Sequence, residues 1–268
     1  MRTLLKALTL GFAVASGAAS AGPTTLIYIN SSAGALYSYD SANSYAETLI
    51  AGSTGAFSIS SGPAANTLYI QSGGGSLSTY DLATNTQTAI GGSVPGNALG
   101  EGRDGLLYAG SGASLYSVNP LTGVSTLIGG GSWSYAGDIA VDPTALLDMY
   151  GAVDTGAGVA LAKINKATGV QTLIGNFGVS GTIYGLGFAL DGTLFATGPE
   201  ANGGSGIYTI DKSTGAATLV HSLRYQAYDM ATQPFDTPEP PNRVPEPASL
   251  ALVGLALLGV AGARRRRN

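Results

Sequence analysis

The chain has 268 residues and a formal net charge of −4, and 10% of its residues are charged, against about 25% in a typical soluble domain. It contains no cysteine, which excludes disulfides, a thiolate nucleophile and a cysteine metal site, and its single histidine excludes a histidine-rich metal centre. Between residues 22 and 244 there are 15 acidic and 6 basic side chains, which would repel phosphate, so we exclude nucleic acid as a partner.

The first 21 residues have the composition of a secretory signal peptide. Arg2 and Lys6 precede an apolar run that extends through Val14, and Ala19-Ser20-Ala21 offers the small residues that signal peptidase accepts. We therefore predict a signal peptide over residues 1–21 and a folded domain over residues 22–235. A retained membrane anchor is the alternative, but the apolar run is short for one.

A unit of 16 residues, seen most clearly at Leu115–Gly130, recurs along the middle of the chain. Gap-free copies begin at residues 77, 161 and 207, and a looser copy covers residues 36–52. An Asp or Asn recurs inside each copy with spacings of 41, 38, 46 and 46 residues, at Asp40, Asp81, Asn119, Asn165 and Asp211. A period of this length is typical of propeller blades or solenoid repeats.

Each unit has the pattern of a β-hairpin. Residues 115–119 alternate as a strand, Pro120 and Gly123 favour a turn, and residues 124–128 form a second strand. Another pair of candidate strands precedes the hairpin, as in residues 99–108 and 186–195, where Asp-Gly pairs predict the turns. Four strands in each of five repeats predict an all-β fold, a five-bladed β-propeller of four-stranded blades.

The first and last repeats are incomplete in complementary ways. The first repeat begins at residues 26–29 and lacks an opening strand, whereas residues 229–234 resemble a spare opening strand. We predict that this C-terminal strand joins the first blade and closes the ring, which would leave no unpaired sheet edge at the termini. The alternative is an open β-solenoid, which would need dedicated caps.

Few side chains suit chemistry, and we expect no catalytic residue, no metal site and no cofactor. Asp138 and Asp229 occupy equivalent places in the opening strands of two blades, and the innermost strand of a propeller lines its channel. Glu101 and Arg103 are expected on one face of the corresponding strand of blade three. These four residues suit a sugar or a cation, but we favour the interpretation that they solvate a water-filled channel or make structural turn contacts.

The aromatic residues divide into two groups. Most of the 14 tyrosines fall at recurrent strand positions, where packing between blades explains them. Trp133 and Tyr135 lie in the glycine-rich residues 129–137, which we predict as a loop, so they are candidates for a contact surface. His221 aligns with glycines at the end of a strand in other repeats, and we expect it to be an exposed loop residue rather than a catalytic base.

The composition changes after residue 235. Residues 236–247 are rich in proline, and we predict a stiff spacer there. Residues 248–263 are apolar and uncharged, and we predict a transmembrane helix there, followed by an arginine-rich cytoplasmic tail at residues 264–268. Taken alone, this pattern also fits an ordinary C-terminal tail anchor.

The end of the chain resembles a known sorting signal. VPEPASLALVGLALLGVAGARRRR, residues 244–267, is similar to the PEP-CTERM signal, with a Pro-Glu-Pro tripeptide, an apolar helix and an arginine-rich end. The matching residues are Pro245, Glu246, Pro247, Arg264, Arg265, Arg266 and Arg267. The resemblance implies processing by an exosortase, a membrane protease-transpeptidase of Gram-negative bacteria that make exopolysaccharide. It further implies export, transient anchoring in the inner membrane, and release to the cell surface or the medium.

The repeats resemble, more weakly, extracellular propeller repeats that include quinoprotein-like units. Those repeats carry a docking Trp after Thr-Gly, whereas Leu127, Leu173 and Leu219 occupy that strand here, so the resemblance implies the fold and not the cofactor. Two function classes follow. The first is a non-enzymatic surface or matrix protein that binds exopolysaccharide or other surface proteins, as in a biofilm. The second is a secreted carbohydrate-active enzyme that uses channel carboxylates. We favour the first.

Overall fold

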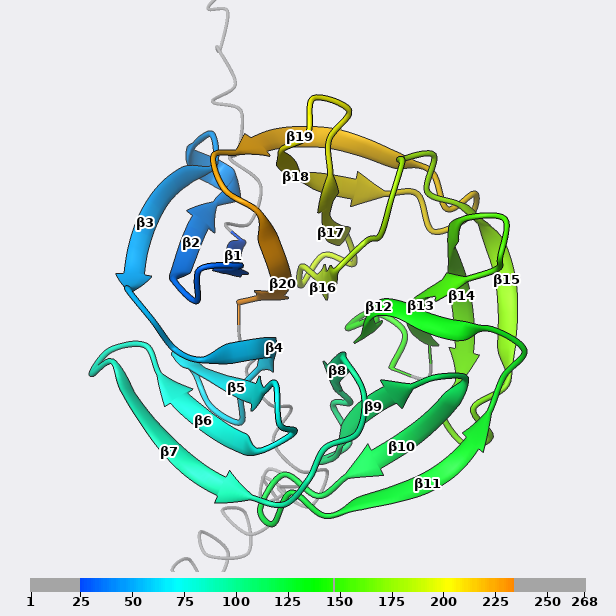
Figure 1. Ribbon diagram of the computed structural model, residues 1–268, viewed down its shortest axis with the longest axis horizontal. Helices are drawn as coiled ribbons and strands as arrows, with labels where there is room; N and C mark the ends of the chain where they lie inside the picture. Colours follow the sequence, from blue (N-terminus) through cyan, green and yellow to red (C-terminus); the bar gives the residue numbers. More distant parts are fainter. Residues whose placement is uncertain (1–24, 147, 234–268) are drawn as a thin grey trace, which may run out of the picture.

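The computed structural model describes residues 25–146 and 148–233, and within them the chain forms five four-stranded antiparallel sheets arranged in a ring (Figure 1). Blade 1 consists of β20 (Ala227–Thr232), β1 (Leu26–Ser31), β2 (Leu36–Asp40) and β3 (Ala46–Ala51), with the 3₁₀ turn η1 (Ser41–Asn43). Blade 2 consists of β4 (Ala56–Ser61), β5 (Thr67–Ser72), β6 (Leu77–Asp81) and β7 (Thr86–Gly91). Blade 3 consists of β8 (Ala98–Glu101), β9 (Leu107–Ser111), β10 (Ser114–Val118) and β11 (Ser125–Gly130). Blade 4 consists of β12 (Ser134–Val141), β13 (Asp148–Asp154), β14 (Val159–Asn165) and β15 (Gln171–Asn176). Blade 5 consists of β16 (Gly185–Phe188), β17 (Leu194–Pro199), β18 (Ser205–Ile210) and β19 (Ala217–Leu223).

This architecture confirms the prediction of an all-β five-bladed propeller with four-stranded blades. The opening strand found near residues 229–234 is β20, which pairs antiparallel with β1 in the register Ile29 to Met230. A strand from the far end of the described chain therefore completes the first sheet. The predicted signal peptide, transmembrane helix and arginine-rich tail lie outside the described residues.

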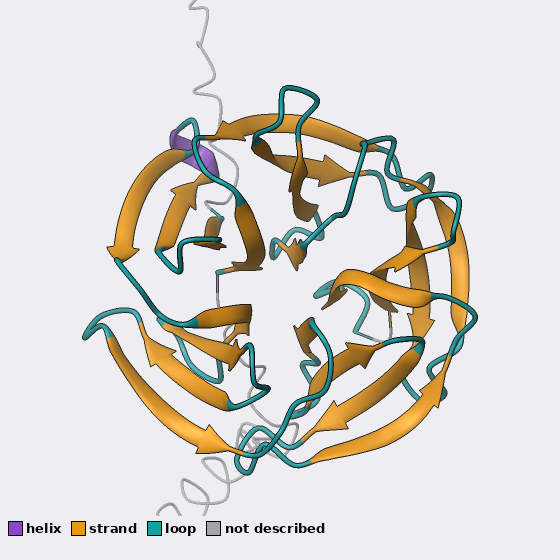
Figure 2. Ribbon diagram, viewed as in Figure 1, coloured by secondary structure: helices purple, strands orange, loops and turns teal. Residues whose placement is uncertain are grey.

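The turns between the third and outer strands follow the chemistry of their sequence (Figure 2). The side chain of Asn119 accepts a hydrogen bond from the backbone N–H of Leu121 at 2.9 Å, and Asp211 accepts one from Ser213 at 2.7 Å. Short polar side chains at such positions bond the backbone two residues ahead and start the turn. The predicted turn role of Asp191 is confirmed in the same way, because it accepts a hydrogen bond from Thr193 N at 2.9 Å.

All five outer strands carry the same irregularity. In each outer pair the register shifts by one residue, and the extra residue is Ile50, Ile90, Ile128, Ile174 or Val220. A bulge of this kind twists the strand and redirects a side chain. Here each bulged residue packs against a buried cluster, while the residue before it remains on the rim of the ring.

The hydrophobic core is divided among the five junctions between neighbouring blades. Leu36 and Ile70, for example, share a cluster between blades 1 and 2, and Leu161 and Phe188 share one between blades 4 and 5. The Thr-Gly turns also serve these junctions. Gly123 has a φ of 68° and touches blade 2 so closely that an added Cβ would lie 2.2 Å from the carbonyl oxygen of Gly91. Glycine is therefore required there both for its backbone angle and for its size.

Candidate functional site

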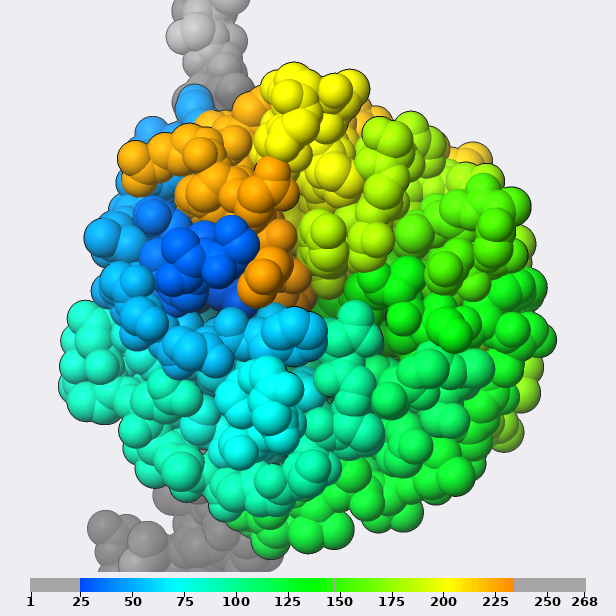
Figure 3. All heavy atoms as spheres, viewed as in Figure 1, coloured from blue at the N-terminus to red at the C-terminus, as the bar shows by residue number. Residues whose placement is uncertain are grey.

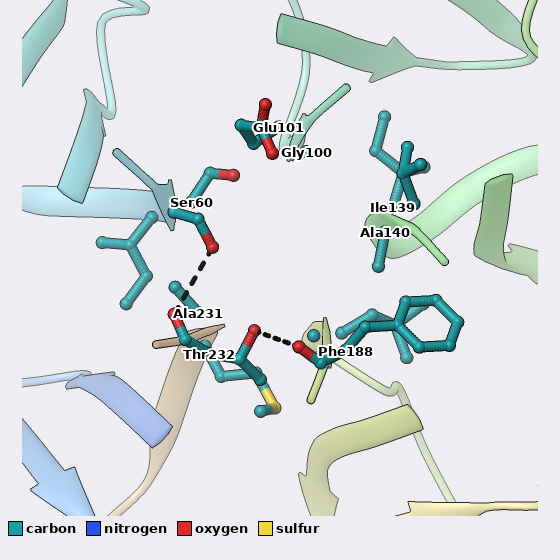
Figure 4. Close-up of a pocket in the computed structure, with 14 residues that line it drawn as sticks. Ser60, Gly100, Glu101, Ile139, Ala140, Phe188, Ala231 and Thr232 are labelled. Carbon is teal, nitrogen blue, oxygen red and sulfur yellow. Dashed lines mark hydrogen bonds between the residues drawn. The ribbon is translucent and has the colours of Figure 1, made fainter. Parts of the chain in front are cut away.

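The centre of the ring is lined by the five inner strands β20, β4, β8, β12 and β16 (Figure 1). They enclose a cavity of about 20 Å³, and Figure 4 shows Ser60, Glu101, Ala140, Phe188 and Thr232 around it, one from each inner strand. The hydroxyl of Thr232 donates to the carbonyl oxygen of Phe188 at 2.6 Å and so joins two of these strands. A cavity of this volume holds about one water molecule, which is far too small for a sugar ring. In the space-filling view, atoms close in around the centre of the ring (Figure 3).

Asp138, on β12, does not line this cavity. It is 1% exposed, and its two carboxylate oxygens accept hydrogen bonds from the backbone N–H of Leu99 at 2.8 Å and of Leu186 at 3.3 Å. These donors belong to β8 and β16, so one carboxylate connects blade 4 to both of its neighbours. Burial and the nearby charge of Asp229 raise the pKa of Asp138 well above its ordinary value.

Asp229, on β20, has the equivalent role in blade 1. It is 1% exposed, and its Oδ2 accepts hydrogen bonds from the hydroxyl of Ser58 at 2.5 Å and from the N–H of Ile59 at 2.8 Å, both on β4. On the other side, a Cβ added to Gly185 of β16 would lie 2.9 Å from Oδ1. Burial raises the pKa of Asp229 to about 8, although its hydrogen bonds oppose the shift.

The sequence placed the two aspartates correctly in opening strands, but the expectation that their side chains face the channel is wrong. At the same position the other inner strands carry Ser58, Ala98 and Gly185, which are small. Each aspartate therefore occupies space that its neighbours leave free and binds backbone groups there. The contacts are structural, but they join neighbouring blades instead of forming the turn contacts that the sequence favoured.

Glu101 and Arg103 do not share a strand, which corrects the prediction. β8 ends at Glu101, and Arg103 lies in the following turn with a φ of 58°. The carboxylate of Glu101 accepts a hydrogen bond from the backbone N–H of Arg103 at 2.7 Å and lines the central cavity. Burial raises the pKa of Glu101 and lowers that of Arg103, although the charge of Glu101 opposes the shift of Arg103.

Of the two aromatic residues predicted in a loop, Trp133 lies in one, directly before β12, and Tyr135 does not. Tyr135 belongs to β12, is 6% exposed, and packs in the junction between blades 3 and 4, where a Cβ added to Gly110 would lie 2.6 Å from its ring. Trp133 is half-buried, and its backbone N and O bond the side-chain amide of Gln171 at 2.9 and 3.0 Å. The prediction that Tyr135 belongs to a loop contact surface is therefore wrong. The glycines of residues 129–137 indicated a loop, but β12 already begins at Ser134.

His221 is likewise not an exposed loop residue. It lies on β19, half-buried, and stacks on Tyr45 with ring centroids 5.5 Å apart at 24°. At this junction between blades 5 and 1, stacked rings take the place of the glycine contacts found where blade 2 meets blade 3, blade 3 meets blade 4, and blade 4 meets blade 5. Tyr37 stacks on Tyr225 at 4.4 Å, and Arg224 forms an ion pair with Glu47.

Three exposed aromatic residues were missed by the sequence analysis: Phe57, Tyr184 and Tyr228. Each directly precedes the position that Asp138 occupies in β12. Aligning the inner strands residue by residue would have found them, but the more regular outer hairpins dominate the repeat signal.

No helix in residues 25–146 and 148–233 is long and apolar enough to cross a membrane. The same ranges hold no group of three or more His, Asp or Glu side chains arranged to bind a metal ion. The sorting residues from Pro245 to Arg267 lie beyond the described part of the chain.

Two solved structures with TM-scores of at least 0.50 support the fold. A symmetrical protein from a study of de novo evolutionary emergence is 19% identical with a TM-score of 0.53, and 79% of this chain covers 99% of it. A chain of a nidogen–laminin complex is 9% identical with a TM-score of 0.50, and 79% of this chain covers 98% of it. TolB from Acinetobacter baumannii is 14% identical with a TM-score of 0.49, and 74% of this chain covers only 53% of it.

No curated protein matches the sequence. Residues 243–267 match the PEP-CTERM protein-sorting motif, which implies export, transient membrane anchoring through the C-terminal region and processing by an exosortase. The chain therefore carries a PEP-CTERM protein-sorting motif behind a five-bladed β-propeller.

Proposed function

We propose that this protein is a non-enzymatic binding or structural propeller of the cell surface or extracellular matrix, associated with exopolysaccharide or with other surface proteins, as in a Gram-negative biofilm. The sorting motif supports the location, because exosortase processing serves exported proteins. The propeller supports a binding role, because a rigid ring presents many loops to a partner.

The observation that carries the non-enzymatic part is the placement of the two aspartates of the inner strands. An enzyme that used them on a sugar would need both carboxylates to reach substrate, about 5–10 Å apart across a glycosidic bond. Asp138 and Asp229 instead bind backbone N–H groups of neighbouring blades, and the central cavity holds about one water molecule. These contacts support a structural role for both residues.

We further infer that residues 248–263 cross the inner membrane as a helix and that an exosortase cuts near Glu246, releasing the propeller to the surface. The pairing of β20 with β1 supports a ring closed by its C-terminal strand, which would stabilise the domain without a disulfide.

The test is a single assay with two readouts. Full-length protein purified in mild detergent is incubated with exopolysaccharide from the cells that produce it, and both retention on the polysaccharide and release of reducing ends are measured. We expect retention without product. Steady release of reducing ends, lost in a Glu101→Gln variant, would favour the enzymatic alternative.

A further inference from the structure

All five inner strands run in the same direction along the ring axis, because each is the first strand of its blade. The loops that lead into them therefore share one face, together with the turns between second and third strands. We call this the entry face, and it comprises residues 52–55, 92–97, 131–133, 177–184 and 224–226 with the turns 32–35, 73–76, 112–113, 155–158 and 200–204. The opposite turns form the exit face, at residues 62–66, 102–106, 142–146, 189–193, 41–45, 82–85, 119–124, 166–170 and 211–216.

Three aromatic side chains stand at equivalent positions where inner strands begin on the entry face. Tyr228 of β20 is 45% exposed, Phe57 of β4 is 42% exposed, and Tyr184, directly before β16, is 38% exposed. The register is fixed by Asp229 and Asp138, which bind the N–H of Ile59 and of Leu99 in the same way. Blades 5, 1 and 2 are consecutive, so the three positions follow one another around the channel mouth. The rings of Phe57 and Tyr228 meet edge to face at 6.3 Å.

Blades 4 and 3 carry no exposed ring at the equivalent position. In blade 4 the equivalent residue is Gly137, where an added Cβ would lie 1.8 Å from the carbonyl oxygen of Ile183. In blade 3 it is Asn97, an exposed amide. Exposed rings gathered in this way are unusual on a soluble domain and mark a contact surface.

The charge distribution indicates the chemistry of the partner. The ten entry-face segments contain two charged residues, Glu200 and Arg224, whereas the exit-face turns contain seven. Arg224 is paired with Glu47, so its charge is offset. The remaining polar groups of the entry face are mostly Ser, Thr, Asn and Gln, which donate and accept hydrogen bonds without charge. Such a surface suits a hydroxylated, uncharged ligand rather than an anionic one.

The central cavity lies away from this mouth. It is lined by the last residues of the same inner strands, such as Ser61 and Thr232, and has a volume of about 20 Å³. The ligand is therefore expected on the exposed rings at the mouth rather than in the cavity. We propose that Phe57, Tyr184 and Tyr228 form a stacking platform for a segment of neutral polysaccharide laid across the mouth of the propeller, an inference that rests on the proposed association with exopolysaccharide.

The experiment compares three full-length proteins purified in mild detergent. Exopolysaccharide from the producing cells is separated by anion exchange into uncharged and charged fractions, and the Kd for each fraction is measured by biolayer interferometry. The platform variant carries Phe57→Ala, Tyr184→Ala and Tyr228→Ala. The matched control carries Leu127→Ala, Leu173→Ala and Leu219→Ala, which remove equally exposed apolar side chains from the outer rim.

We expect the parent and the rim control to bind the uncharged fraction, and the platform variant to bind it about tenfold or more weakly, since aromatic anchors carry much of the energy of such contacts. A Tyr184→Phe, Tyr228→Phe variant keeps the stacking faces and should retain binding, and thermal unfolding confirms that all variants fold. If the platform variant binds like the parent, or if the parent binds only the charged fraction, the platform is wrong while the association with exopolysaccharide stands. If the parent binds neither fraction, both proposals fail.

Discussion

Ser58 donates its hydroxyl to the carboxylate of Asp229 across the junction between blades 2 and 1, at 2.5 Å. The strand that carries Asp229 is thus fixed twice, by its ladder with β1 and by side-chain contacts with β4. Asp138 makes the corresponding link among blades 3, 4 and 5. The two buried carboxylates therefore connect the inner strands in two groups, β20 with β4 and β12 with β8 and β16, around an axis that has little room for anything else.

Replacing either aspartate by asparagine should destabilise the propeller by about 1–3 kcal/mol, because the new amide would direct N–H groups at backbone N–H donors and leave buried groups unpaired. For Asp229→Asn the conflict arises with Ile59 or with Met230, whichever way the amide turns. Urea unfolding of the single variants measures the loss. Unchanged midpoints would mean that these hydrogen bonds contribute nothing to stability.

The stability of the propeller should fall as pH rises from about 4 to about 8. Burial raises the pKa of Asp229 from 3.8 to about 8, so the native state holds a proton that the unfolded state has lost in this window. Unfolding is then favoured as pH increases, since stability falls wherever the native state binds more protons. Asp138 shifts in the same direction. Thermal unfolding at pH 5 and pH 8 measures the slope, and Asp229→Asn should flatten it. A Tm that rises over this range contradicts the protonated native state.

Removing residues 228–235 should lower the Tm by many degrees, because blade 1 loses its inner strand and β1 becomes an unpaired edge. Deletion of residues 236–243, of equal length in the spacer, is the control. A truncated protein that melts like the parent would show that the C-terminal strand does not lock the ring.

Gly123→Ala should cost clearly more stability than Gly105→Ala. Both glycines have positive φ, 68° and 84°, but a Cβ at Gly105 meets nothing within 4 Å, whereas one at Gly123 collides with Gly91 of the neighbouring blade. The φ penalty alone is about 1 kcal/mol. The excess measured for Gly123→Ala in urea unfolding reports the junction contact, and equal losses at the two sites would rule that contact out.

The architecture was predictable because each hairpin repeat, such as residues 115–130, contains its strand alternation and its turn residues within one short segment of sequence. The junctions were not, because their contacts join distant residues. Asp138 binds N–H groups 39 and 48 residues away, and no pattern within one blade indicates that its side chain turns from the channel into the gap between blades. Tyr135 was misplaced for a similar reason. Its glycine-rich surroundings indicate a loop, but its ring packs against Gly110 of the neighbouring blade, a contact that the local sequence does not indicate. His221 packs on Tyr45 at the position where blades 3 and 4 carry Gly129 and Gly175, which the repeat alignment alone did not indicate.

The most direct test of the account is mass spectrometry of the mature protein recovered from the cell surface and medium. Processing at the PEP-CTERM motif should remove the apolar segment and Arg264–Arg267, leaving a C-terminus close to Glu246. A variant with Ala in place of Pro245, Glu246 and Pro247 should instead remain in the membrane with its arginine tail. Recovery from the surface of a protein that ends at Asn268 would contradict the sorting on which the proposed function depends.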